Sequence, residues 1–121
     1  MNRCADINQR IAQRLGGLRS EQVWWQDPES GYKRRTLTPP GISHHLQLSE
    51  VHFPPGARVT FENAPGPPSR QQIWILEGTM QVHLGQRDYR LTGGDCMVMT
   101  LDQPVILYNP GPGQARYVAA L

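Results

Sequence analysis

The sequence lacks long apolar runs, a strong net charge and more than two cysteines, and each absence excludes a class of protein. No apolar run approaches the roughly 20 residues that a membrane-spanning helix needs. No apolar core of a secretory signal occurs near Met1, so a cytoplasmic location is expected. A net charge of +2 does not by itself indicate nucleic-acid binding. Cys4 and Cys96 cannot form a disulfide framework, and we interpret both as free thiols in a reducing cytoplasm.

Only one segment, residues 6–18, has helical periodicity. Its apolar residues fall on one stripe, at Ile7, Ile11, Leu15 and Leu18. Asp6 and Gln9 have capping-box spacing, and Gly16-Gly17 is a stop signal. We therefore predict a short amphipathic helix within residues 1–20. Its arginines are interpreted as a solvated face, with a transit peptide as the weaker alternative.

The rest of the chain is rich in turn residues. Eleven prolines and twelve glycines separate short apolar or alternating segments, with a turn roughly every eight to twelve residues. This rhythm predicts an all-β sandwich or barrel, formed by residues 21–121 as one domain. We find no internal repeat beyond this rhythm and no linker that would divide the domain.

Residues 23–38 predict a β-hairpin, with turn residues at 27–31 between its strands. The basic run Lys33-Arg34-Arg35 on its second strand is interpreted as a solvated face or as edge protection, with a phosphate-contacting patch as the alternative. An exposed hairpin edge invites pairing, and the apolar stripe of the helix also needs a surface. We therefore expect a two-fold homodimer with the hairpin or the helix at its interface.

The central stretch, residues 71–85, predicts two strands joined at Glu77-Gly78. The first is apolar from Ile73 to Leu76, which is typical of a strand buried on both faces. The second alternates apolar and polar side chains. A further apolar strand starts at Cys96, so we expect Cys96 in the core rather than as a nucleophile.

Four short motifs occur in an order and spacing that resemble the cupin family. They are Pro54-Pro55-Gly56, Leu76-Glu77-Gly78, Gly94-Asp95 and Asn109-Pro110-Gly111. The resemblance covers residues 42–121 and implies a cupin-type double-stranded β-helix, that is, a jelly-roll barrel. The expected fold class is therefore all-β, with a short N-terminal helix added.

A narrower resemblance covers the N-terminal third. Residues 25–35 are similar to the lead-in of the cupin sensor domain of xenobiotic-response-element type helix-turn-helix transcriptional regulators. Residues 7–19 resemble the first helix of the DNA-binding domain of those regulators. A helix-turn-helix needs two further helices, and Arg19 to Val23 leaves no room for them. No specific nucleic-acid binding by this chain alone is expected, and no membrane association.

Most enzymatic cupins bind a divalent metal through two histidines, a glutamate and a third histidine. The family spacing places Pro65 and Pro67 at the first two histidines, Gln71 at the glutamate and Val105 at the last histidine. Proline and valine side chains offer no lone pair, and a neutral amide replaces carboxylate poorly. The histidines of the sequence are interpreted as satisfied or solvated: His44, His45, His52 and His83. We predict no metal, no other cofactor and no catalytic residues.

The resemblance also implies which side chains face the barrel interior. They are Gln71, Ile73, Ile75, Met97, Met99, Val105 and Leu107. These residues either pack as core or enclose a small ligand. With Gln71 as the polar group, we expect a small neutral or weakly polar effector. The predicted function is a metal-free, non-enzymatic sensing or regulatory module. The alternatives are a DNA-binding regulator acting with a partner and a small cupin enzyme with an atypical site.

Overall fold

The computed structural model describes residues 17–41, 46–63 and 69–121. The predicted helix over residues 6–18 lies outside them, apart from its last two positions. Also outside are Cys4, His44, His45, Pro65 and Pro67. The helical element within the described ranges is a single 3-10 turn, η1, at Arg19–Glu21. None of the helical structure in these ranges is long and apolar enough to cross a membrane.

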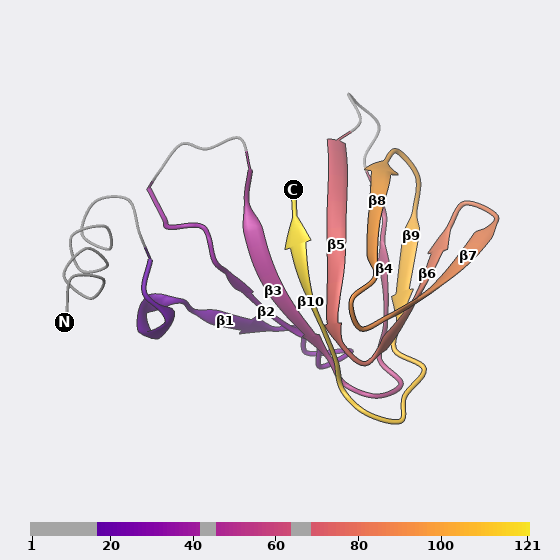
Figure 1. Ribbon diagram of the computed structural model, residues 1–121, viewed down its shortest axis with the longest axis horizontal. Helices are drawn as coiled ribbons and strands as arrows, with labels where there is room; N and C mark the ends of the chain where they lie inside the picture. The colour runs from indigo at the N-terminus through magenta and orange to yellow at the C-terminus, as the bar shows by residue number, and fades with distance from the viewer. Residues whose placement is uncertain (1–16, 42–45, 64–68) are drawn as a thin grey trace.

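The chain folds into two antiparallel sheets (Figure 1). The strands are β1 (Trp24–Gln26), β2 (Lys33–Thr36), β3 (Leu48–Phe53), β4 (Arg58–Phe61), β5 (Ser69–Glu77), β6 (Thr79–Leu84), β7 (Arg87–Thr92), β8 (Cys96–Leu101), β9 (Val105–Tyr108) and β10 (Ala115–Ala120). The larger sheet has the order β1-β2-β3-β10-β5-β8, and the smaller has the order β4-β9-β6-β7. The predicted all-β class is confirmed.

The core lies between the two sheets, because alternate residues of each strand point to the same face. The largest fully buried side chains come from both sheets: Phe53, Ile73, Ile75, Met80, Val82 and Met99. Tyr32 stacks on Phe53 with ring centroids 5.1 Å apart, and Phe53 stacks on Tyr117 at 6.1 Å. This aromatic row anchors the start of β2 to the core.

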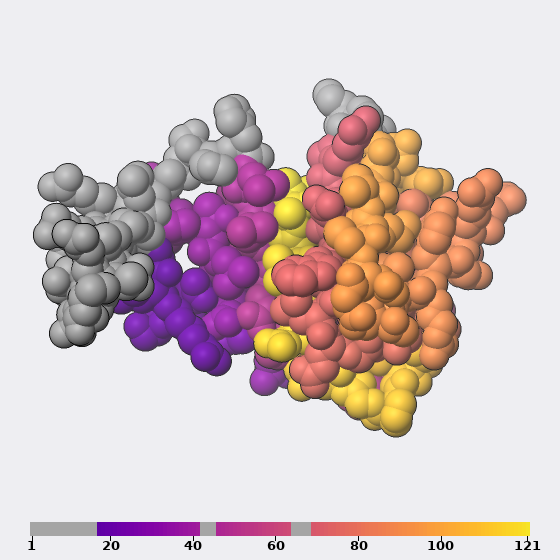
Figure 2. Space-filling model, viewed as in Figure 1, coloured from indigo at the N-terminus to yellow at the C-terminus, as the bar shows by residue number. Residues whose placement is uncertain are grey.

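The predicted hairpin is present as the antiparallel pair β1 and β2. In the space-filling view, the hairpin and β3 form the left part of the molecule, and strands β5 to β9 form the right part (Figure 2). β1 is the edge strand of the larger sheet. The expectation that this hairpin or the N-terminal stripe forms a dimer interface stays a prediction.

Two expectations about burial are wrong. β5 is not buried on both faces, because Trp74 is 50% exposed between the buried Ile73 and Ile75. Cys96 is exposed rather than in the core, and its Sγ accepts a 3.4 Å hydrogen bond from Nε2 of Gln72. Trp74 and Cys96 are register partners on the outer face of the larger sheet. The apolar pattern of these strands does not reveal that their outer face is exposed.

Two family-like motif residues have structural roles. Gly78 joins β5 to β6 at a φ of +79°, and a Cβ there would lie 2.6 Å from the carbonyl oxygen of Gln114. Asn109 is buried, and its Nδ2 donates to the carbonyl oxygens of Phe53 and Gly113, both at 2.9 Å. Its Oδ1 accepts from the amide of Gly111 at 2.8 Å. Asn109 therefore fixes the turn before β10 against the end of β3.

Candidate functional site

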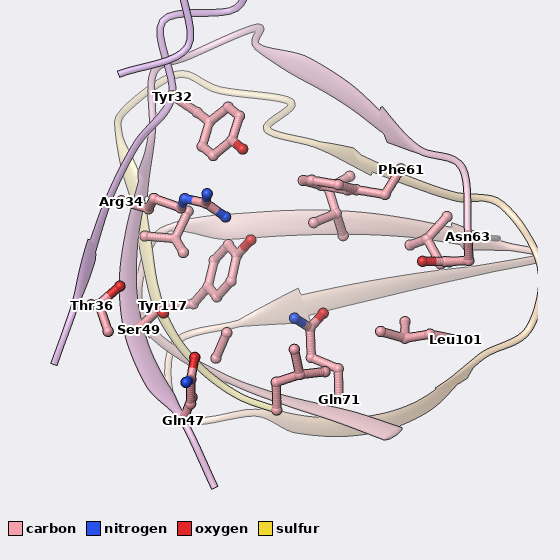
Figure 3. A pocket seen from close by; sticks show the side chains of 15 residues that line it. Tyr32, Arg34, Thr36, Gln47, Ser49, Phe61, Asn63, Gln71, Leu101 and Tyr117 are labelled. Carbon is pink, nitrogen blue, oxygen red and sulfur yellow. The ribbon is translucent and has the colours of Figure 1, made fainter. Parts of the chain in front are cut away.

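A cavity of about 280 Å³ lies between the sheets. It is formed where β2, β4, β8 and β10 end and where β3, β5 and β9 begin. Its lining residues are Tyr32, Arg34, Thr36, Gln47, Ser49, Val51, Phe61, Asn63, Gln71, Leu101, Val105, Leu107, Tyr117, Ala119 and Leu121 (Figure 3). At about 30 Å³ per water molecule, the cavity has room for roughly nine waters. That volume suits one small organic molecule.

One wall of the cavity follows from strand register. Arg34 of β2 pairs with Val51 of β3, and Val51 pairs with Tyr117 of β10. Two residues further along these strands, Thr36 pairs with Ser49, and Ser49 pairs with Ala119. Because alternate residues share a face, both rows point to the same side of the larger sheet. All six residues line the cavity.

Four polar groups converge on the cavity. Figure 3 shows the Arg34 guanidinium, the Tyr32 and Tyr117 hydroxyls and the Gln71 amide directed into the same space. Arg34 is the one charged side chain among the lining residues that the structure describes. It makes no ion pair with any acidic residue of residues 17–41, 46–63 and 69–121. Over the same ranges, neither hydroxyl nor the Gln71 amide has a hydrogen-bond partner.

The two tyrosines of the cavity have shifted ionisation. Burial, as the main cause, raises the pKa of Tyr117, and the neighbouring Tyr32 raises it further. Burial also raises the pKa of Tyr32. The positive charge of Arg34 opposes both shifts without reversing them. Both side chains therefore stay protonated at neutral pH and can donate a hydrogen bond into the cavity.

The residues predicted to form a pocket separate into two groups. Gln71, Val105 and Leu107 line the cavity. The other four are packed in or against the core, with Ile73, Ile75 and Met99 buried and Met97 partly buried. Sequence reasoning missed the polar side chains of Arg34, Tyr32 and Tyr117. The alternation of Tyr32, Arg34 and Thr36 was the available signal, but it does not say which face of the hairpin lies inside.

The basic run on β2 is divided between two faces. Lys33 is exposed, as a solvated strand face would be. Arg34 lines the cavity. Arg35 lies on the outer face, where its Nη2 is 2.6 Å from Oε1 of the buried Glu50. The interpretation of the run as a solvated face therefore holds for the exposed Lys33 and Arg34, although Arg34 also lines the cavity, and it is wrong for Arg35.

The family metal positions that the structure describes are Gln71 and Val105, and both line the cavity. No group of three or more His, Cys, Asp or Glu side chains that could hold a metal occurs in the described part of the chain. The two described histidines each have one carboxylate partner. Nε2 of His52 is 2.6 Å from Glu50, and Nδ1 of His83 is 2.6 Å from Asp88. The cavity therefore offers hydrogen bonds and one positive charge rather than metal ligands.

Comparison with known proteins identifies the fold. No family model and no curated protein matches the sequence. The Cupin_2 domain of an XRE family transcriptional regulator from Enterobacter cloacae matches with a TM-score of 0.66 and 11% identity, over 74% of this chain and 93% of that domain. An RmlC-like cupin from Shewanella frigidimarina matches with a TM-score of 0.67 and 18% identity, over 87% of this chain and 86% of the other.

A regulator with a longer chain also matches. An HTH_3 family transcriptional regulator from Vibrio cholerae has a TM-score of 0.66 and 18% identity, over 96% of this chain and 59% of the regulator. The chain therefore spans less than two thirds of that protein. The resemblance seen in the sequence motifs is confirmed at the level of fold. This chain has the cupin fold, which it shares with the cupin domain of an XRE family transcriptional regulator.

Proposed function

We propose that the chain is a non-enzymatic cupin module that binds a small molecule and acts in regulation. The observation that carries this proposal is the cavity of about 280 Å³ at one end of the two sheets. Its convergent polar groups make no hydrogen bond within the described residues, so their donors and acceptors are available to a ligand that enters the cavity. A ligand that pairs with them would be bound in preference to water.

The chemistry of the lining supports binding rather than catalysis. None of the lining residues is a His, Cys, Asp or Glu. General acid–base catalysis works best with a group whose pKa is near the working pH. The two tyrosines have their pKa values raised, further from neutrality, and arginine does not lose its proton in proteins. The cavity therefore has groups that hold a ligand but no ordinary group that would transfer a proton.

The regulatory part of the proposal is supported by the regulator cupins of similar fold. The chain after Arg19 runs from η1 directly into β1 at Trp24, without the second and third helices of a helix-turn-helix. Any output of ligand binding would therefore pass through another protein or another copy of the chain, and not through a recognition helix in this segment.

Thermal-shift screening of a metabolite library tests the proposal. Ala119 lines the cavity, and the larger leucine side chain of Ala119→Leu would fill part of its space. Ala120 is the next residue on β10 and points to the opposite face, so Ala120→Leu is the matched control. Compounds that raise the melting temperature of the wild type and of Ala120→Leu by several degrees are expected to lose this effect on Ala119→Leu. Equal stabilisation of all three proteins would contradict binding in the cavity.

A further inference from the structure

We infer that the ligand of this cavity is a small amphipathic monocarboxylate. Its carboxylate is bound by Arg34 with the hydroxyls of Tyr32 and Tyr117, and its apolar body lies against the opposite wall. This inference rests on the proposed ligand-binding function and names the class of ligand for the same cavity. It departs from the expectation of a neutral effector, which was based on Gln71 as the polar group of the cavity and did not include Arg34.

The first argument is the charge of Arg34. Arginine is always protonated, and its planar guanidinium binds a carboxylate through two parallel hydrogen bonds. Here the guanidinium is held from one side by Trp25, with its Cζ 5.0 Å from the ring centroid. Contact with a ring face does not use the N–H donors of the guanidinium. Since no described acidic residue pairs with Arg34, those donors are free to bind an anion from outside the chain.

The second argument is the set of donors around Arg34. The positive charge of Arg34 acts on both tyrosines, so the three groups are close enough to interact electrostatically. Figure 3 shows the Tyr32 and Tyr117 hydroxyls on either side of the guanidinium, with the Gln71 amide beyond Tyr117. A carboxylate accepts up to about four hydrogen bonds. A guanidinium and two protonated phenols match that capacity, whereas a neutral amide or ether would leave donors unpaired.

The third argument is the apolar half of the cavity. Phe61 and Leu101 lie across from Arg34 in Figure 3, and Val105 and Leu107 complete this wall. A volume of about 280 Å³, comparable with roughly nine waters at about 30 Å³ each, suits a small ligand. One positive charge compensates a monoanion but not a phosphate dianion, which is costly to desolvate. The lining therefore fits a short aliphatic or single-ring carboxylate.

The test compares acids with their neutral amides. Isothermal titration calorimetry on the full chain would use hexanoate and benzoate as probes, with hexanamide and benzamide as uncharged equivalents. At least one acid is expected to bind wild type about tenfold more tightly than its amide, as a charge-assisted hydrogen bond allows. Arg34→Gln should lower the affinity for that acid by at least about tenfold and leave the affinity for the amide unchanged. Lys33→Gln removes the neighbouring charge outside the cavity and should change neither affinity by more than about twofold.

Tyr117→Phe is a second variant that does not depend on Arg34. It keeps the ring that stacks on Phe53 and removes only the hydroxyl, so folding should be retained. Its affinity for the acid should fall several-fold, again without a change for the amide. Far-ultraviolet circular dichroism and the melting temperature of each variant check that the fold is unchanged.

Three results would overturn the inference. They are acids that do not bind wild type, amides that bind as tightly as acids, or equal losses of acid affinity in Lys33→Gln and Arg34→Gln. These failures are separable from failure of the proposed function. If neutral compounds from the metabolite library still distinguish Ala119→Leu from Ala120→Leu, the cavity binds ligands and only the carboxylate inference is wrong. If no compound distinguishes those two variants, both proposals are wrong.

Discussion

The guanidinium of Arg34 lies over the indole ring of Trp25, and these two residues are register partners on β1 and β2. One position along, Arg35 lies over Trp24 at 4.9 Å on the opposite face. The edge strand thus supplies one aromatic ring for each arginine. Because adjacent strand residues point to opposite faces, the hairpin sends one arginine to the cavity and the other to the outer surface.

Trp25→Ala is expected to weaken carboxylate binding without unfolding the protein. A cation–π contact at an exposed site contributes about 0.5–1 kcal/mol, so affinity should fall roughly two- to fivefold as Arg34 loses its support. Trp25 is 46% exposed on an edge strand, which limits the loss of burial. Trp24→Ala is the control, because Trp24 contacts Arg35 and His52 rather than Arg34. Calorimetry with hexanoate or benzoate measures both variants, and equal losses would contradict a specific role for Trp25.

Purified protein is expected to contain less than about a tenth of an equivalent of Fe, Mn, Ni or Zn. A site with three or four protein ligands would retain far more metal through purification. The reason is the chemistry of the family ligand positions, where Pro65, Pro67, Gln71 and Val105 occur. Elemental analysis of protein purified without chelator measures this directly. Treatment with a chelator should also leave the melting temperature unchanged. A stoichiometric metal that survives dialysis would refute the prediction.

DNA binding, if it occurs, is expected to be weak and independent of sequence. The described chain has no recognition helix between Arg19 and β1, so only phosphate contacts from basic side chains are available. Dissociation constants should be no tighter than about the micromolar range and should rise steeply with salt. Gel shifts at two salt concentrations test this. A sequence-specific complex that persists at the higher concentration would favour the DNA-binding alternative.

Much of the fold could be predicted from the sequence, because its signals are local. The hairpin at residues 23–38 and the joint at Glu77-Gly78 follow from turn chemistry and alternation within a few residues. Two of the cupin-like motifs, Pro54-Pro55-Gly56 and Asn109-Pro110-Gly111, lie side by side in the fold. The amide of Gly56 donates to the carbonyl oxygen of Asn109 at 2.8 Å.

The site was harder to predict, because it depends on register between strands that are distant in sequence. Arg34 lines the cavity because β2 pairs with β3 so that Arg34 is opposite Val51, and β3 pairs with β10 so that Val51 is opposite Tyr117. A shift of one residue in the pairing of β2 with β3 would turn Arg34 to the outer face and Arg35 towards the cavity. The exposure of Trp74 and Cys96 also could not be predicted, because the apolar composition of β5 and β8 does not show that their outer face is uncovered.

The outer face opposite the cavity contains a buried carboxylate whose titration should be visible in stability. Glu50 accepts from Nη2 of Arg35 at 2.6 Å and lies 2.6 Å from Nε2 of His52, with Nη1 of Arg116 at 3.7 Å. Burial alone would raise the pKa of Glu50. The hydrogen bonds of His52 and Arg35, with the charge of Arg35, outweigh burial and hold the pKa below the usual glutamate value.

Glu50 should therefore stabilise the fold above the unfolded-state pKa, about 4.3, and this contribution should be lost as pH falls through the lower folded-state pKa. Glu50→Gln should reduce the free energy of unfolding at pH 7 by about 1–3 kcal/mol, because it leaves Arg35 without its charged partner. Its deficit relative to wild type should shrink as the buffer is acidified below pH about 4.

Glu77→Gln is the matched control. Glu77 is an exposed glutamate that contacts Arg116 at 3.5 Å, so its removal should cost less than about 0.5 kcal/mol at any pH. Urea unfolding of the three proteins across this range measures the difference, and parallel pH profiles for wild type and Glu50→Gln would show that Glu50 is not the titrating group.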